Sequence, residues 1–336
     1  MLILAALACA PQAALPDPCP LATDLKVQTA DGGTIALHHH FGKGPPVILV
    51  HGISSNHWFW DLDADHSAAR WLVAHGFDPW LLDLRGHGSA RTTEDGTPQV
   101  SGWTVDDYGR YDVPAAVDYV RAVTGYAQVG YVGHSMGGMV GAIYAATGGA
   151  GSLSSLTMVG SPATFDGTIP LLKLARVGLA AAGGSLFFVE SGTFADAAAG
   201  LGPAVPGKLQ YKLYNPEHFQ PTTERRMLQS IVSPMSREEM QQFSRMLRDE
   251  RFESADGTLD WAAELGKVQT PLLAIAGGAD EVGRPAFVHH WVEVAGGPSA
   301  YVEVPDYGHL DLGLGEDAER DVFPLFERWL REHPTR

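Results

Sequence analysis

Short apolar runs of four to six residues recur along this chain and alternate with segments of helical length. A run such as Val47–Val50 contains no polar residue, as expected of a strand that is buried on both faces of a parallel sheet. The alternation favours βαβ units with right-handed crossovers, and therefore a mostly parallel, doubly wound sheet. The predicted central strands are Val47–Val50, Trp80–Asp83, Ala127–Val132, Leu156–Val159, Leu272–Ala276 and Tyr301–Val304.

A hairpin and five helices complete the predicted core. Alternating residues at Asp24–Thr29 and Thr34–His39 flank a turn at 31–33, which predicts two antiparallel strands at one edge of the sheet. The sequence therefore predicts an α/β fold with an eight-stranded sheet. The predicted helices are Ala64–His75, Tyr108–Val123, Gly137–Ala146, Pro285–Val294 and Asp317–Glu332.

One long interval, between Pro162 and Pro271, interrupts the alternation. It is rich in Ala, Gly, Leu and Met and has helical periodicity without a clear strand. We interpret it as an inserted helical cap at 164–263, which divides the core into segments 21–163 and 264–336. Its methionines either line an apolar mouth for flexible substrates or simply pack the cap onto the core. These methionines are Met227, Met235, Met240 and Met246.

The motif Gly133-His134-Ser135-Met136-Gly137 follows a predicted strand and precedes a predicted helix. In this G-x-S-x-G pattern the serine occupies a sharp, strained turn, and the glycines two positions away remove clashes that larger side chains would cause. Ser135 is therefore the candidate nucleophile, with its hydroxyl exposed at the carboxyl edge of the sheet.

With this motif in this context, the chain resembles the α/β-hydrolase superfamily from about residue 24 onward. Val50-His51-Gly52-Ile53 resembles the segment in which that family supplies one oxyanion-hole donor, and the resemblance assigns this role to the Ile53 N–H. The N–H of Met136, directly after the nucleophile, would be the second donor. The motif Asp83-Leu84-Arg85-Gly86-His87-Gly88 resembles a turn that many members carry, and we interpret His87 as architectural.

A serine nucleophile needs a histidine base and a carboxylate that orients it, and the family places these in the order Ser, acid, His. Asp280 lies just past the predicted strand Leu272–Ala276, so it is the candidate acid, with Glu281 as the alternative. His309 follows the last predicted strand and is the candidate base. We expect Asp311 to do no more than orient this loop.

The segments 308–330 and 77–88 resemble the acid-lipase and polyhydroxyalkanoate-synthase-like branch of the superfamily. Since the synthases of that branch use cysteine, Ser135 favours ester hydrolysis. The expected protein is a serine carboxylesterase or lipase acting on a small-molecule or lipid ester with an apolar acyl group. The alternative is an acyltransferase that uses the same triad with an alcohol or thiol acceptor. Neither activity implies a cofactor.

Composition and charge exclude several other classes. The net charge of −16 opposes nucleic-acid binding, and the only two cysteines, Cys9 and Cys19, precede the core, so the core has no cysteine nucleophile or cysteine metal site. No nucleotide-binding glycine motif is present. His38-His39-His40 lack a nearby acidic residue in the sequence, and we interpret them as part of an exposed edge strand rather than a metal site.

Residues 1–20 read as a targeting segment and linker. The apolar run Met1–Ala10 is too short to span a bilayer but resembles the hydrophobic region of an export signal. Leu7-Ala8-Cys9 also resembles the end of a bacterial lipoprotein signal, in which case a lipidated Cys9 would tether the protein to a membrane. We therefore expect a periplasmic, outer-membrane or secreted protein, with a cytoplasmic enzyme that has a frayed apolar start as the alternative. The oligomeric state is not indicated.

Overall fold

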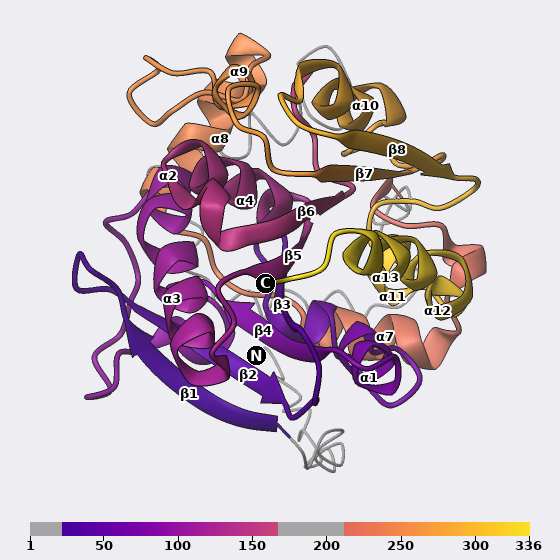
Figure 1. The fold of residues 1–336 in the computed structure, drawn as a ribbon. Helices are drawn as coiled ribbons and strands as arrows, with labels where there is room; N and C mark the ends of the chain where they lie inside the picture. Colours follow the sequence, from indigo (N-terminus) through magenta and orange to yellow (C-terminus); the bar gives the residue numbers. More distant parts are fainter. Residues whose placement is uncertain (1–21, 167–211) are drawn as a thin grey trace, which may run out of the picture.

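An eight-stranded sheet forms the centre of the computed structural model, which describes residues 22–166 and 212–336 (Figure 1). Its strand order is β1-β2-β4-β3-β5-β6-β7-β8. The β1–β2 and β2–β4 pairs are antiparallel, and every other pair is parallel. The strands are β1 (Ala22–Gln28), β2 (Thr34–His40), β3 (Pro46–Val50), β4 (Asp78–Asp83), β5 (Val129–His134), β6 (Leu153–Val159), β7 (Leu272–Gly277) and β8 (Ser299–Val304). The predicted α/β architecture is confirmed.

Helices cover both faces of the sheet, which is why the central strands are apolar on both sides. In β3, Ile48 and Val50 belong to one apolar core, and Val47 and Leu49 belong to the other. The first core packs against α3 (Val113–Thr124), α4 (Met136–Ala146), α9 (Trp261–Leu265) and α10 (Pro285–Val294). The second core packs against α1 (Ala68–Ala74) and α13 (Phe323–Glu332). Shorter helical elements are η1 (His57–Phe59), η2 (Gly88–Arg91), α2 (Val105–Asp107), η3 (Tyr108–Asp112), η4 (Gly149–Ser152), η7 (Pro216–His218), α11 (Asp311–Leu314) and α12 (Ala318–Asp321).

Three predicted helices differ from the structure by more than one residue at an end: Ala64–His75, Tyr108–Val123 and Asp317–Glu332. The first begins at Ala68 rather than Ala64, because the Ser67 hydroxyl accepts the N–H of Arg70 and caps the helix there. The second is π-helical in η3 and α-helical only in α3, from Val113. The predicted helix Asp317–Glu332 is wrong as a single element, since it divides into α12 and α13. Pro324 has no N–H to continue a preceding helix, and it lies in the first turn of α13, where that N–H is not needed.

The cap prediction falls partly on residues 167–211, which lie outside the described residues. Between β6 and β7 the structure describes α7 (Pro221–Ser230), α8 (Arg237–Asp249) and α9. Met227, Met240 and Met246 are buried, and Met227 and Met246 belong to the two apolar cores, so these three methionines pack cap helices rather than line a mouth. The boundaries 164–263 of a separate cap stay a prediction.

The interpretation of the triple histidine is wrong. Strand β2 lies between β1 and β4 and is therefore not an edge strand, and each of its three histidines pairs with a carboxylate from elsewhere in the chain. Sequence proximity could not reveal these partners because strand order brings them together. The pairs are His38 with Asp24 and Asp83, His39 with Asp78, and His40 with Asp61.

His38 makes stability depend on pH. Burial by itself would lower the pKa of His38, but the Asp83 and Asp24 carboxylates raise it to about 9. A histidine whose pKa is raised on folding contributes stability that is complete below about pH 6.5 and is lost as the pH rises through about 9. We therefore expect the free energy of unfolding to fall between pH 7 and pH 9.5.

This expectation is checked by urea unfolding across that range with wild type and His38→Gln. The variant should be less stable at pH 7, and its stability should change less between the two pH values. Parallel pH curves for the two proteins would show that His38 carries no such charge.

Candidate active site

Ser135 occupies a strained turn between β5 and α4. Its backbone has φ 50° and ψ −119°, in a region that residues with a Cβ rarely adopt. Neighbouring glycines permit this turn: a Cβ on Gly133 would lie 2.3 Å from the carbonyl carbon of Gly137, and a Cβ on Gly137 would lie 2.4 Å from the Val50 carbonyl oxygen. The sequence motif thus produces the expected elbow, and its glycines let α4 pack closely against the end of β3.

The loop that follows β3, residues Gly52–Asn56, passes beside Ser135, and we call it the oxyanion loop. A Cβ on Gly52 would lie 3.1 Å from the Ser135 Cβ, so the backbone here approaches Ser135 closely. Ile53, the expected first donor, is the next residue. Met136 is the first residue of α4, so its N–H has no helical carbonyl to bind. Met136 thus follows Ser135 directly, and Ile53 follows the residue whose backbone approaches it.

His309 and Asp280 form a buried pair. His309 Nδ1 lies 2.7 Å from Asp280 Oδ2, and both side chains are nearly inaccessible to solvent. The other Asp280 oxygen accepts the N–H groups of Val282 and Gly283 at 2.7 and 2.8 Å. Glu281, the alternative acid, is partly exposed and pairs instead with Lys212. The geometry therefore places Asp280, and not Glu281, on the candidate base.

His134, the residue before Ser135, links the serine elbow to the His309 loop. Its Nε2–H donates to the His309 carbonyl at 3.0 Å, and its ring stacks on Phe59. Burial, together with the neighbouring His309, holds the pKa of His134 well below its ordinary value, so it is a neutral donor. A Cβ on Gly160, the residue after β6, would lie 3.3 Å from His309 Nδ1, so a side chain there would contact the candidate base tightly. The sequence motif gave no indication that His134 has this role.

Asp311 braces the His309 loop more strongly than expected. Its buried carboxylate accepts the Gly308 N–H at 2.7 Å and contacts His218 Nδ1 at 2.8 Å. The Leu310 N–H donates to the Leu213 carbonyl at 2.9 Å. The segment around 213–218 therefore supports this loop, a contact that no local sequence pattern indicates.

The oxyanion loop is braced by the end of α7 and the segment that follows it. The Ser54 hydroxyl donates to the Ser233 carbonyl at 2.6 Å, and the Ser233 N–H donates back to the Ser54 carbonyl at 3.0 Å. The Asn56 amide donates to the Ser230 carbonyl at 2.9 Å. At the start of the loop, burial lowers the pKa of His51 to about 4, so it is neutral and donates Nδ1–H to the Gly52 carbonyl at 2.8 Å.

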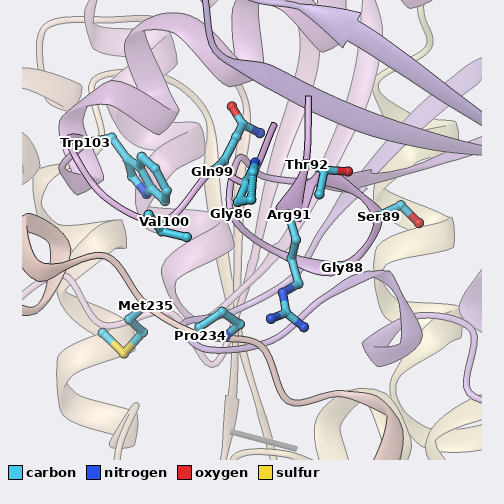
Figure 2. Close-up of a pocket in the computed structure, with 11 residues that line it drawn as sticks. Gly86, Gly88, Ser89, Arg91, Thr92, Gln99, Val100, Trp103, Pro234 and Met235 are labelled. Carbon is cyan, nitrogen blue, oxygen red and sulfur yellow. The ribbon is translucent and has the colours of Figure 1, made fainter. Parts of the chain in front are cut away.

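A cavity of about 500 Å³ lies between the turn after β4 and the chain at Pro234–Met235 (Figure 2). Figure 2 shows Trp103, Val100 and Met235 on one side of it and Ser89 and Thr92 on the other. Met235 is the one described cap methionine among its lining residues. Ser135, Asp280 and His309 are not among its lining residues, so we do not assign this cavity to the candidate site.

A second cluster, formed by His38, His57 and Asp83, brings metal-binding groups together outside this site, with ligand atoms within 4.8 Å of one another. Its geometry does not suit a metal. A metal bound by two imidazoles must lie near the plane of each ring, but these two rings are stacked, with centroids 3.6 Å apart and planes at 24°.

In the described part of the chain no helix is long and apolar enough to span a membrane.

Comparison with known proteins agrees with this architecture. A family model described as "alpha/beta hydrolase fold" matches residues 45–316. Lysosomal acid lipase/cholesteryl ester hydrolase from Homo sapiens is 32% identical over 130 residues, which cover 35% of this chain and 33% of that protein. Gastric triacylglycerol lipase from Bos taurus is 30% identical over 131 residues, covering 35% of this chain and 33% of that protein. The chain thus matches about a third of the length of these two curated relatives.

Longer matches have lower identity. Lipase member K from Mus musculus is 24% identical over 347 residues, covering 91% of this chain and 87% of that protein. Among solved structures, a thermophilic esterase from Thermogutta terrifontis has a TM-score of 0.64 at 21% identity, covering 93% of this chain and 100% of that chain. The expected resemblance to the acid-lipase branch is confirmed by these relatives, and the chain belongs to the α/β hydrolase fold family.

Proposed function

We propose that this protein is a serine ester hydrolase in which Ser135 is the nucleophile, His309 the base and Asp280 the acid. The observation that carries the proposal is the convergence of three strand ends: the elbow after β5, the carboxylate after β7 and the histidine after β8 lie at one edge of the sheet. In open α/β sheets this carboxyl edge is where active sites are built. The named lipase and esterase relatives favour the same reaction class.

The proposed reaction begins when Ser135 Oγ attacks the ester carbonyl carbon while His309 Nε2 accepts the hydroxyl proton. Asp280, bonded to His309 Nδ1–H, fixes the tautomer and stabilises the imidazolium that forms. The imidazolium then protonates the leaving alcohol, and an acyl group remains on Ser135. Water, deprotonated by His309, attacks this acyl-enzyme and releases the acid.

The carbonyl oxygen becomes negatively charged in both steps, and the Ile53 and Met136 N–H groups would stabilise it. Each such donor is typically worth about 2.7 to 4 kcal/mol in the transition state. The N-terminus of α4 points at the same position, so its dipole adds to the stabilisation of the charge.

We propose a lipid ester with an apolar acyl group as the substrate class. The lysosomal and gastric relatives are named for triacylglycerol and cholesteryl ester hydrolysis, and those names concern their own substrates. Acyl transfer to an alcohol or thiol would use the same groups, but the relatives named above favour water as the acceptor.

We also propose that the protein is exported and that residues 1–20 carry the signal, with Cys9 as a lipid attachment site or with cleavage as a secretory signal. These residues lie outside the described residues. Relatives whose names place them in the stomach or the lysosome agree with export.

Removing the triad side chains should abolish turnover. Ser135→Ala and His309→Ala are expected to lower kcat by at least about 10⁴-fold, because they remove the nucleophile and the base, and Asp280→Asn by about 10⁴-fold, because the base loses its orientation. Hydrolysis of p-nitrophenyl butyrate measures this loss. Glu281→Gln is the matched control, which should retain nearly full activity; a large loss there with little loss in Asp280→Asn would move the acid to Glu281.

Acyl-chain preference tests the substrate class. Across p-nitrophenyl esters from acetate to palmitate, with Ser135→Ala as the blank, kcat/KM should rise with chain length, since more apolar surface is buried on binding. Activity confined to acetate and butyrate would instead identify a small-ester esterase.

Export is tested by fractionation and mass spectrometry of the mature protein. We expect it outside the cytoplasmic fraction, either beginning after Ala10 or carrying a lipid on an N-terminal Cys9. An intact, unmodified Met1–Ala10 segment on cytoplasmic protein would contradict export.

A further inference from the structure

Asp83, the last residue of β4, is fully buried and accepts four N–H groups. Its Oδ1 accepts the backbone N–H of His57 at 2.7 Å. Its Oδ2 accepts the Ser89 N–H at 2.8 Å and lies 2.9 Å from both His38 Nε2 and His57 Nδ1. A Cβ on Gly88 would lie 2.1 Å from Oδ2, so the following turn closes over the carboxylate.

The histidines around Asp83 supply its countercharge. His38 Nε2 faces Asp83 and His38 Nδ1 faces Asp24 at 2.6 Å, so His38 can donate to both carboxylates only as an imidazolium. Burial raises the pKa of Asp83, but His57 and His38 outweigh this and hold it well below its ordinary value. The cluster therefore contains a buried ion pair, and both oxygens of Asp83 accept N–H groups.

The residues that flank the oxyanion loop, His51 and His57, are hydrogen-bonded to Leu84 and Asp83 at the end of β4. His57 directly follows the loop and opens η1, so the bond from its N–H to Asp83 fixes the far end. At the near end, His51 Nε2 accepts the Leu84 N–H at 3.3 Å. Ile53 lies between these two ends, so its position depends on the contacts that His51 and His57 make with the end of β4.

We propose that Asp83 is a positioning residue that fixes the oxyanion loop, and with it the Ile53 N–H, in the geometry that stabilises the transition state. This inference rests on the proposed ester hydrolysis at Ser135. It adds a role for the first residue of the Asp83–Gly88 motif, which acts through the loop and does not touch the substrate.

The test compares Asp83→Asn with Asp78→Asn. Asp78 begins the same strand and also accepts N–H groups, from His39, Gly42 and Trp80, but at the opposite end of β4. Both variants lose a carboxylate that is paired with a histidine of β2. Of these two carboxylates, only Asp83 also binds the end of the oxyanion loop. Differences between them therefore report the loop rather than the loss of a buried charge.

Three measurements separate positioning from general destabilisation. Hydrogen exchange of a peptide that covers 52–57 reports the loop without any substrate. Kinetics on p-nitrophenyl butyrate, per site titrated with a fluorophosphonate, excludes misfolded molecules from the rate. A trifluoromethyl ketone, which forms a charged adduct with the serine, reports the oxyanion contacts by its inhibition constant.

For Asp83→Asn we expect faster exchange in the loop, a fall in kcat per site of about 10- to 100-fold, a KM within about threefold of wild type, and weaker ketone binding by a factor similar to that in kcat. This loss is smaller than the 10²- to 10³-fold typical of deleting a donor, because the Ile53 N–H is displaced rather than removed. Asp78→Asn should show none of these changes per titrated site.

Unchanged loop exchange or unchanged kcat per site in Asp83→Asn would overturn the inference, as would an equal effect in Asp78→Asn. If Asp83→Asn does not fold, His38→Gln replaces it: it removes the countercharge and should still loosen the loop, and unchanged exchange there also overturns the inference. If wild type has no Ser135-dependent hydrolysis, the proposed function fails, and loop exchange alone decides whether Asp83 holds the loop.

Discussion

The close contact between α4 and the end of β3 is the constraint on which the candidate site depends. A Cβ on Gly137 would overlap the Val50 carbonyl, and a Cβ on Gly133 would overlap the backbone of Gly137, so neither position admits a side chain without movement. This contact holds Ser135 in its strained conformation and brings the helix N-terminus beside Gly52. Strain in a backbone persists only where surrounding packing enforces it, and here the two buried strands and the helix supply that packing.

Four buried histidines near this edge of the sheet fall into two electrostatic classes. His51, His87 and His134 are buried without a directly bonded carboxylate, and burial lowers the pKa of His51 to about 4 and that of His87 to about 3. They therefore act as neutral donors that tie loops to backbone carbonyls. His38 is equally enclosed but has two carboxylate partners, and so carries a charge. Burial disfavours the charged form of a histidine that has no carboxylate partner, which is why His38 differs from the other three.

The sequence predicts those parts of the fold that local patterns determine. Apolar runs identify the central strands, and the glycine spacing around Ser135 identifies the elbow, because both depend on neighbouring residues. The partners of His38, His39 and His40 could not be predicted, since they follow from the order of strands in the sheet. The role of His134 was missed for a related reason: its partner is a carbonyl 175 residues away. The break at Pro324 was visible in the sequence and shows that one proline outweighs the helical pattern around it.

The central claim is that Ser135 carries the acyl group during turnover. Rapid acid quenching of the enzyme with a slowly hydrolysed ester, followed by peptide mass spectrometry, tests it directly. The account predicts one acyl adduct, on the peptide that contains Ser135, that forms within the first turnover and disappears as the substrate is consumed. An adduct on another residue, or steady-state hydrolysis with no adduct on Ser135 under any quench condition, would contradict it.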